Sequence, residues 1–126
     1  MNGRKRLRRA ALLLALLVLA AIVTGVAESA ATTVVPKQLT GKWRRGGAVM
    51  DIDPLGLGGI ERGLGGFDLV FERVAAHRLA ISGAPSCSGT GTYRWTVANR
   101  KLKLTKIHDA CKSRVGWLAG TWSRPN

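Results

Sequence analysis

The sequence predicts an all-β fold: a small antiparallel up-and-down β-barrel of about six strands, preceded by an N-terminal hydrophobic helix. Two observations predict the barrel. Short runs of alternating apolar and polar residues recur after Ala31, and no stretch there shows a convincing helical repeat. An apolar run behind a cluster of cations predicts the helix. With 126 residues, the chain can build a single modest core.

Residues 1–31 have the pattern of a signal peptide or signal anchor. Five cations precede an apolar run from Ala10 to Ala27, which is longer than the ~7–15 residues of a usual signal peptide and reaches the lower limit for a membrane-spanning helix. Small residues at suitable spacing fit cleavage after Ala27, Ser29 or Ala31. We favour cleavage, but a retained anchor stays open. Either fate predicts export across the cytoplasmic membrane, with the rest of the chain secreted or anchored outside.

After a linker over residues 32–38, the predicted barrel domain covers residues 39–126. Each predicted strand alternates one apolar face with one polar face, as expected for antiparallel strands that cover a core on one side. The six predicted strands cover residues 39–44, 67–72, 78–81, 93–98, 101–105 and 115–123.

The glycine-rich segment 46–66 is predicted to be a mobile loop over the fold. Gly-Leu-Gly-Gly begins at Gly56 and recurs at Gly63, and so much glycine is entropically costly to order. Glu61 stands where the dinucleotide-binding pattern needs its third glycine, so a phosphate cradle fits poorly. A calcium loop is also excluded, because Leu55 and Arg62 occupy positions that need oxygen donors.

Cys87 and Cys111 are the only cysteines, and in an exported chain they predict one disulfide. The competing interpretation is a redox or metal pair. No CxxC spacing supports it, and His77 and His108 do not complete a known ligand pattern. We therefore expect no metal and no cofactor.

The two runs between the cysteines predict a hairpin with a tight turn at residues 99–100. This turn lets both runs share one buried face, pairing Val97 with Leu102 and Trp95 with Leu104. The same ladder leaves the two cysteines one step out of line. We expect a bulge at Gly89 or Gly91 to absorb that step.

The exported part is strongly basic. Residues 32–126 contain 15 Lys and Arg against 6 Asp and Glu, a net charge of +9. Such a surface attracts anionic lipid or wall polymer, while export argues against nucleic acid. The alternative is that these cations only solubilise the strands and protect sheet edges. The expected basic patch comprises Lys42, Arg44, Arg45, Arg94, Lys101 and Lys103.

Several short motifs resemble the lipocalins and the wider calycin group. Gly41-x-Trp43 is similar to their first-strand motif, and the second half is similar to small exported lipocalin-like proteins of high-GC bacteria. The resemblance implies that Trp43 closes one end of the barrel and that Arg124 or Arg114 packs across it. The matching residues of the second half are Gly91, Tyr93, Trp95, Leu102, Leu104, Asp109, Cys111, Arg114, Gly120, Thr121 and Trp122.

The resemblance also implies a small apolar ligand, such as a lipid or isoprenoid, inside the barrel. The same side chains could instead be no more than the core of a small domain. The sequence departs from the group, because only six strands are predicted where a lipocalin has eight, and a narrow barrel leaves little room for a ligand. The expected ligand-lining or core residues are Trp43, Phe67, Phe71, Tyr93, Trp95, Leu104 and Trp122.

Catalysis is not expected. His108 and Asp109 are the only adjacent imidazole and carboxylate, and Ser113 or Ser88 would have to be the nucleophile. Neighbours on a strand point to opposite faces, so the pair would not align as base and orienter. The predicted function is a non-enzymatic exported domain that binds a small apolar ligand, or alternatively docks on anionic lipid or wall polymer. The residues specify no oligomeric state.

Overall fold

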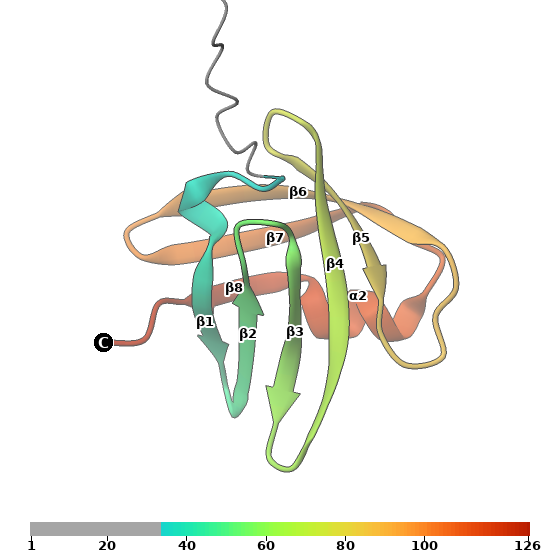
Figure 1. Cartoon of the computed structure of the whole chain (residues 1–126), viewed down its shortest axis with the longest axis horizontal. Coiled ribbons are helices and arrows are strands. Elements are labelled where there is room, and N and C mark those ends of the chain that lie inside the picture. The colour runs from blue at the N-terminus through green and yellow to red at the C-terminus, as the bar shows by residue number, and fades with distance from the viewer. Residues whose placement is uncertain (1–33) are drawn as a thin grey trace, which may run out of the picture. The chain divides into compact units, whose positions relative to one another are not determined.

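The protein's structure is a computed structural model that describes residues 34–126, and these form a closed antiparallel barrel of eight strands. Neighbours in sequence are neighbours in the barrel, and β8 closes against β1 (Figure 1). The strands are β1 (Gly41–Arg45), β2 (Ala48–Ile52), β3 (Leu57–Arg62), β4 (Gly65–Ala75), β5 (Arg78–Gly83), β6 (Thr90–Ala98), β7 (Lys101–His108) and β8 (Gly120–Ser123), with the short helices η1 (Lys37–Leu39) and α2 (Lys112–Leu118). The predicted N-terminal helix lies outside the described residues.

The up-and-down barrel is confirmed, but the count of six strands is wrong because segment 46–66 contains β2 and β3 instead of a loop. Its glycines allow close approach between strands. A Cβ on Gly58 would overlap the carbonyl oxygen of Asp51 on β2, and one on Gly59 would lie 2.5 Å from the carbonyl oxygen of Phe67 on β4. Glycine here marks tightly packed strands, where composition alone indicated disorder.

The predicted strand over residues 115–123 is also wrong in its first half. Residues Lys112–Leu118 form α2, and only Gly120–Ser123 form β8. Arg114 and Leu118, four residues apart, lie on one side of α2 and are both buried. A helix of seven residues is too short to produce a clear repeat in the sequence.

The predicted linker reaches the core. Val35 of this linker is 1% exposed. Leu39, predicted to begin the first strand, instead ends η1 and is 0% exposed. The backbone N–H of Val34 donates to Pro54 in the β2–β3 loop, and the N–H of Arg73 on β4 donates to Val34. The chain is therefore fixed across one end of the barrel before β1 begins.

The β6–β7 hairpin is confirmed with its predicted pairs and turn. Asn99 and Arg100 have φ of 51° and 61°, as a tight hairpin turn requires. The bulge is not at Gly89 or Gly91. It lies on β7, where Ile107 is the extra residue between two paired positions.

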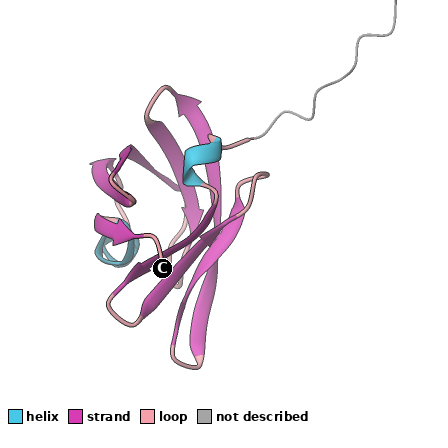
Figure 2. Cartoon of the chain, turned by 90° about the vertical axis from the view of Figure 1, so that its left-hand side faces the viewer, coloured by secondary structure: helices cyan, strands magenta, loops and turns pink. Residues whose placement is uncertain are grey.

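Figure 2 shows the strands curving around the barrel interior. Alternate residues of all eight strands fill that interior. The largest fully buried side chains include Trp43, Trp122, Tyr93 and Phe71, and each is 0% exposed. Aliphatic residues of β2 to β5 and β7 pack between them. Within residues 34–126, no helix has the length and apolar character needed to cross a bilayer.

Candidate functional site

The seven expected ligand-lining or core residues all belong to the barrel's hydrophobic cluster. Six of them are at most 5% exposed. The seventh, Phe67, is half-buried and packs edge-to-face on Trp117 of α2, with 5.3 Å between ring centroids. These side chains fill the barrel with one another, as core residues do.

One buried polar atom of the interior has no partner among the described residues. Trp95 is 5% exposed, and its indole Nε1 donates to no acceptor. The His77 ring lies 4.8 Å from the Trp95 ring, and the backbone N–H of Trp95 donates to the His77 carbonyl. The β4–β5 turn therefore folds over this end of β6.

An arginine near the C-terminus of the chain stacks on the tryptophan of the first strand. We call such a tryptophan–arginine stack, with its hydrogen bonds, a clasp. The indole Nε1 of Trp43 donates to the carbonyl oxygen of Leu39 at 2.9 Å. The guanidinium of Arg124 stacks over the Trp43 ring, 3.8 Å from its centroid, and donates to the carbonyl oxygens of Thr40 and Gln38. Arg124, rather than Arg114, thus packs across the first-strand tryptophan.

A second clasp repeats the first one with the strands exchanged. The indole Nε1 of Trp122 donates to the carbonyl oxygen of Leu118 at 3.1 Å. The guanidinium of Arg45 lies 4.4 Å from the centroid of the Trp122 ring and donates to the carbonyl oxygens of Ala119 and Trp117. Arg124, which follows β8, thus covers Trp43 on β1, and Arg45 on β1 covers Trp122 on β8.

Residues 39–45 and 118–124 share the pattern Leu-x-Gly-x-Trp-x-Arg, which the prediction from sequence missed. Both glycines have positive φ, +102° at Gly41 and +129° at Gly120. A Cβ on Gly41 would lie 2.7 Å from Nη1 of Arg124, and one on Gly120 equally close to Arg45. Glycine is needed for the backbone conformation and for the approach of the arginine. Comparing the two segments directly would have revealed the repeat.

The two clasps flank the seam at which the barrel closes. β1 and β8 pair at Arg44 and Ser123, the equivalent positions of the two motifs. Stacked arginines therefore hold together an edge with a short backbone ladder. This role places Arg45 against Trp122 and the backbone, apart from the other members of the expected basic patch.

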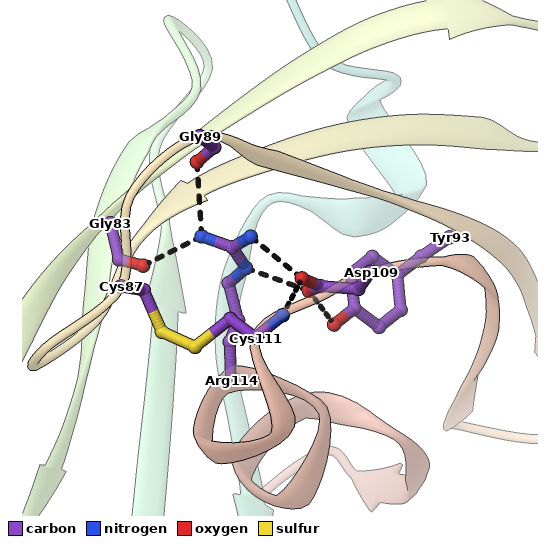
Figure 3. The surroundings of a disulfide bond; sticks show 7 residues. All are labelled: Gly83, Cys87, Gly89, Tyr93, Asp109, Cys111 and Arg114. Atoms are coloured by element: carbon purple, nitrogen blue, oxygen red, sulfur yellow. Dashed lines mark hydrogen bonds and ion pairs between the residues drawn. A yellow bond between two sulfur atoms is a disulfide. The ribbon is translucent and has the colours of Figure 1, made fainter.

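A buried ion pair joins Asp109, just after β7, to Arg114 on α2 (Figure 3). Asp109 and Arg114 form a two-fold contact, Oδ2 to Nε and Oδ1 to Nη2, each at 2.7 Å. The Tyr93 hydroxyl donates to Oδ2 at 2.5 Å, and the Cys111 N–H donates to Oδ1 at 2.9 Å. The Asp109 side chain is 0% exposed and the Arg114 side chain 1%. These bonds satisfy both carboxylate oxygens, so Asp109 is held as a structural anion.

The hydrogen bonds shift the acid–base behaviour of all three side chains. Arg114 above all, with Tyr93 and Cys111, lowers the pKa of Asp109 to about 2 against the effect of burial. Burial and the hydrogen bond to Asp109 raise the pKa of Tyr93. The hydrogen bond to Asp109 likewise raises the pKa of Arg114. Asp109 and Arg114 are therefore charged, and the Tyr93 hydroxyl is protonated, throughout the physiological pH range.

The disulfide between Cys87 and Cys111 lies beside this network, with 5.7 Å between the Cα atoms (Figure 3). Nη1 of Arg114 donates to the carbonyl oxygens of Gly83 and Gly89, which bracket the β5–β6 loop that carries Cys87. Bridge and arginine together fix this loop to the start of α2.

The outer surface of β5, β6 and β7 presents exposed cations with no acidic side chain among them. We call this set the cationic face: Arg78, Arg94, Lys101, Lys103 and Lys106. Arg78 pairs with Arg94 across β5 and β6, and Lys103 pairs with Thr96 across β6 and β7. A hollow of about 490 Å³ is lined by Arg94, Thr96, Lys103, Thr105, Lys106 and Ile107.

The charges are segregated along the chain. Residues 78–126 carry nine Lys and Arg but a single acidic residue, the buried Asp109. Residues 34–77 carry six Lys and Arg against five Asp and Glu. The protein therefore has one strongly cationic side and one nearly balanced side.

The other expected patch residues lie in different surroundings. Arg44 is exposed on β1 and pairs with Ser123, which in turn pairs with Lys101, so it continues the cationic face across the seam. Lys42 pairs with Asp51 and lines a different hollow, of about 380 Å³, together with Glu61 and Asp68. Three of the six expected residues, Arg94, Lys101 and Lys103, thus belong to the cationic face itself.

Within residues 34–126, no group of three His, Cys, Asp or Glu side chains is placed to hold a metal ion. His108 is exposed at the end of β7, whereas Asp109 points into the buried ion pair. The Asp109 carboxylate therefore does not orient the His108 imidazole as it would in a catalytic pair. Comparison with protein-family models, curated sequences and solved structures finds no match.

Proposed function

We propose that this protein is a non-enzymatic exported domain that docks on an anionic phospholipid surface through the cationic face. The observation that carries the proposal is the segregation of charge: five exposed Lys and Arg side chains on β5 to β7 have no acidic side chain among them. A Lys or Arg held near an anionic bilayer contributes about 1 kcal/mol to binding. Five such side chains on one rigid sheet together contribute about 5 kcal/mol, which supports reversible docking.

The alternative, that the cations only solubilise the strands, predicts mixed signs on every face. The balanced side has that character, since Lys42 pairs with Asp51 and lies near Glu61 and Asp68. The cationic face differs from it on the same barrel. This contrast favours recognition of anions over general solubility.

Binding of a small apolar ligand inside the barrel has less support. Trp43, Phe71, Tyr93 and Trp122 are all 0% exposed and occupy the interior. A ligand there would have to displace side chains that stabilise a small domain. Among residues 34–126, the unpartnered indole N–H of Trp95 is the feature that favours an interior guest.

The relation to lipocalins also remains a proposal. Its support is the closed eight-stranded up-and-down barrel and the stacking of Arg124 over Trp43. Both features concern the fold, and neither indicates that the barrel binds a ligand.

The experiment is sedimentation of residues 32–126 with vesicles at several salt concentrations. We expect binding to vesicles with anionic headgroups, little binding to neutral phosphatidylcholine vesicles, and steep loss as salt rises, because exposed charges are screened within ~8 Å at physiological ionic strength. Binding that survives high salt would contradict the proposal. A soluble anionic wall polymer is the third arm, and binding to it without binding to vesicles would reassign the partner.

A further inference from the structure

Five exposed apolar side chains gather at one end of the barrel. Seven large apolar residues of the described chain are more than a third exposed. Leu57 and Val70 face each other as partners across β3 and β4. We call the apolar patch Val34, Leu55, Leu57, Val70 and Val74, which are between 38% and 62% exposed.

Backbone contacts make the patch continuous. The N–H of Val34 donates to Pro54, which precedes Leu55, and the N–H of Arg73, which precedes Val74, donates to Val34. Cγ1 of Val34 also lies 3.4 Å from the Cβ position of Gly56, between Leu55 and Leu57. Val34 therefore sits between the β2–β3 loop and β4. Figure 1 shows this loop and the β4–β5 hairpin at the end of the barrel where η1 lies.

The patch surrounds the point where residues 1–33 join the barrel. The apolar run of the sequence ends at Ala27, so only six residues separate it from Val34. Even fully extended, this connection spans no more than about 25 Å. If the run lies in a bilayer, the patch must stay close to that bilayer.

We infer that the apolar patch is a membrane-contact surface that rests on the lipid bilayer in which residues 10–27 are embedded as an anchor. The inference rests on the proposed function for export of the domain, and it takes the retained anchor, the alternative that the sequence leaves open beside cleavage. A bilayer fits better than a second copy of the chain, because two domains of net charge +9 repel each other. All five patch side chains are aliphatic. Exposed Glu72 lies between Val70 and Val74 on the same face of β4, so the patch presents apolar side chains beside a charged one, as a surface at the boundary between acyl chains and headgroups does.

The test uses the full chain reconstituted in neutral phosphatidylcholine vesicles that contain a trace of lipid with a photoactivatable acyl chain. Neutral lipid removes the electrostatic attraction, so failure of the cationic face does not affect the readout. We expect cross-links in the peptides that carry Val34, Leu55, Leu57, Val70 and Val74. Substituting Leu55→Ser and Leu57→Ser should reduce the yield in those peptides to the background of the domain.

Leu64 is the matched control. It is a fully exposed leucine in the β3–β4 turn, at the opposite end of β3 from Leu57, and we expect its peptide to stay unlabelled. Equal labelling of Leu64 and the patch would overturn the inference. Recovery of the chain in the aqueous fraction, cross-links between copies through the patch, or native protein that lacks residues 1–31 would overturn it as well.

Discussion

Removing the arginine of the buried ion pair should destabilise the domain strongly and change its response to acid. Arg114→Met leaves the Asp109 carboxylate buried with the Tyr93 hydroxyl and one backbone N–H as its remaining donors. Breaking such a pair on one side costs about 3–5 kcal/mol. We expect a loss of that size at pH 7 in the free energy of unfolding, measured by urea titration with tryptophan fluorescence.

The pH dependence provides the sharper test. Asp109 has a pKa of about 2 in the folded protein against 3.8 as its ordinary value, so its ionised form contributes roughly 2–3 kcal/mol of stability. This contribution is complete above about pH 5 and is lost as the pH falls through 4 towards 2. Because Arg114 is the largest cause of the lowered pKa, the acid-induced loss should shrink in Arg114→Met.

The matched control is Arg94→Met, which removes an exposed arginine of β6. It should change stability by no more than about 0.5 kcal/mol and leave the acid response unchanged. An Arg114→Met variant with a loss below about 1 kcal/mol, or with the same acid response as the parent protein, would refute the assignment of Asp109 as a structural anion.

Three further changes test other parts of the fold. Replacing Cys87 and Cys111 by alanine opens a loop of about 25 residues and should lower the free energy of unfolding by about 3.5 kcal/mol on the chain-entropy model; an unchanged denaturation midpoint would contradict this. Trp95→Phe should cost less than Trp43→Phe in urea titrations, because only the indole of Trp43 has a hydrogen-bond acceptor, and the reverse order would refute this. Arg124→Ala should cost about 1–3 kcal/mol, with no rescue by lysine, which lacks the planar donor pair; full rescue would exclude the stacked geometry.

Local patterns predicted the parts of the fold that depend on neighbours in sequence. Trp95 and Val97 alternate with polar residues, and Asn99 supplies the turn, so the β6–β7 hairpin follows from a short stretch. The disulfide followed from the presence of two cysteines in a chain predicted to be exported. These features need no knowledge of distant strands.

The errors arise where residue identity has two physical explanations. Glycines such as Gly58 are costly to order, but they are also the residues that let strands approach closely, and only the β2–β3 pairing decides between the two. Arg45 was expected in the basic patch from its charge, yet it stacks on a tryptophan 77 positions away. Its partner becomes evident only when β8 closes on β1.

Only part of the cationic face was predictable from the sequence. Alternation placed Arg94, Lys101 and Lys103 on the outer face. The order of strands around the barrel determines that Lys42 lies beside Asp51, away from that set. The count of charges along the chain shows their segregation, but the order of the strands is needed to place the cations on one face of the barrel.

The central claim is that one face of the barrel binds an anionic surface, and two matched charge-loss variants of residues 32–126 test it most directly. One variant changes Arg94, Lys101 and Lys103 to glutamine. The other changes three exposed cations within residues 34–77 to glutamine, so that both variants lose three positive charges. The control cations are Lys37, Lys42 and Arg62.

The measurement is the affinity of each variant for anionic vesicles at one fixed salt concentration. At about 1 kcal/mol per cation, the first variant should bind roughly 100-fold more weakly than the parent protein, whereas the control should bind almost as well. Equal losses in the two variants would show that net charge alone drives binding, and that result would contradict the account.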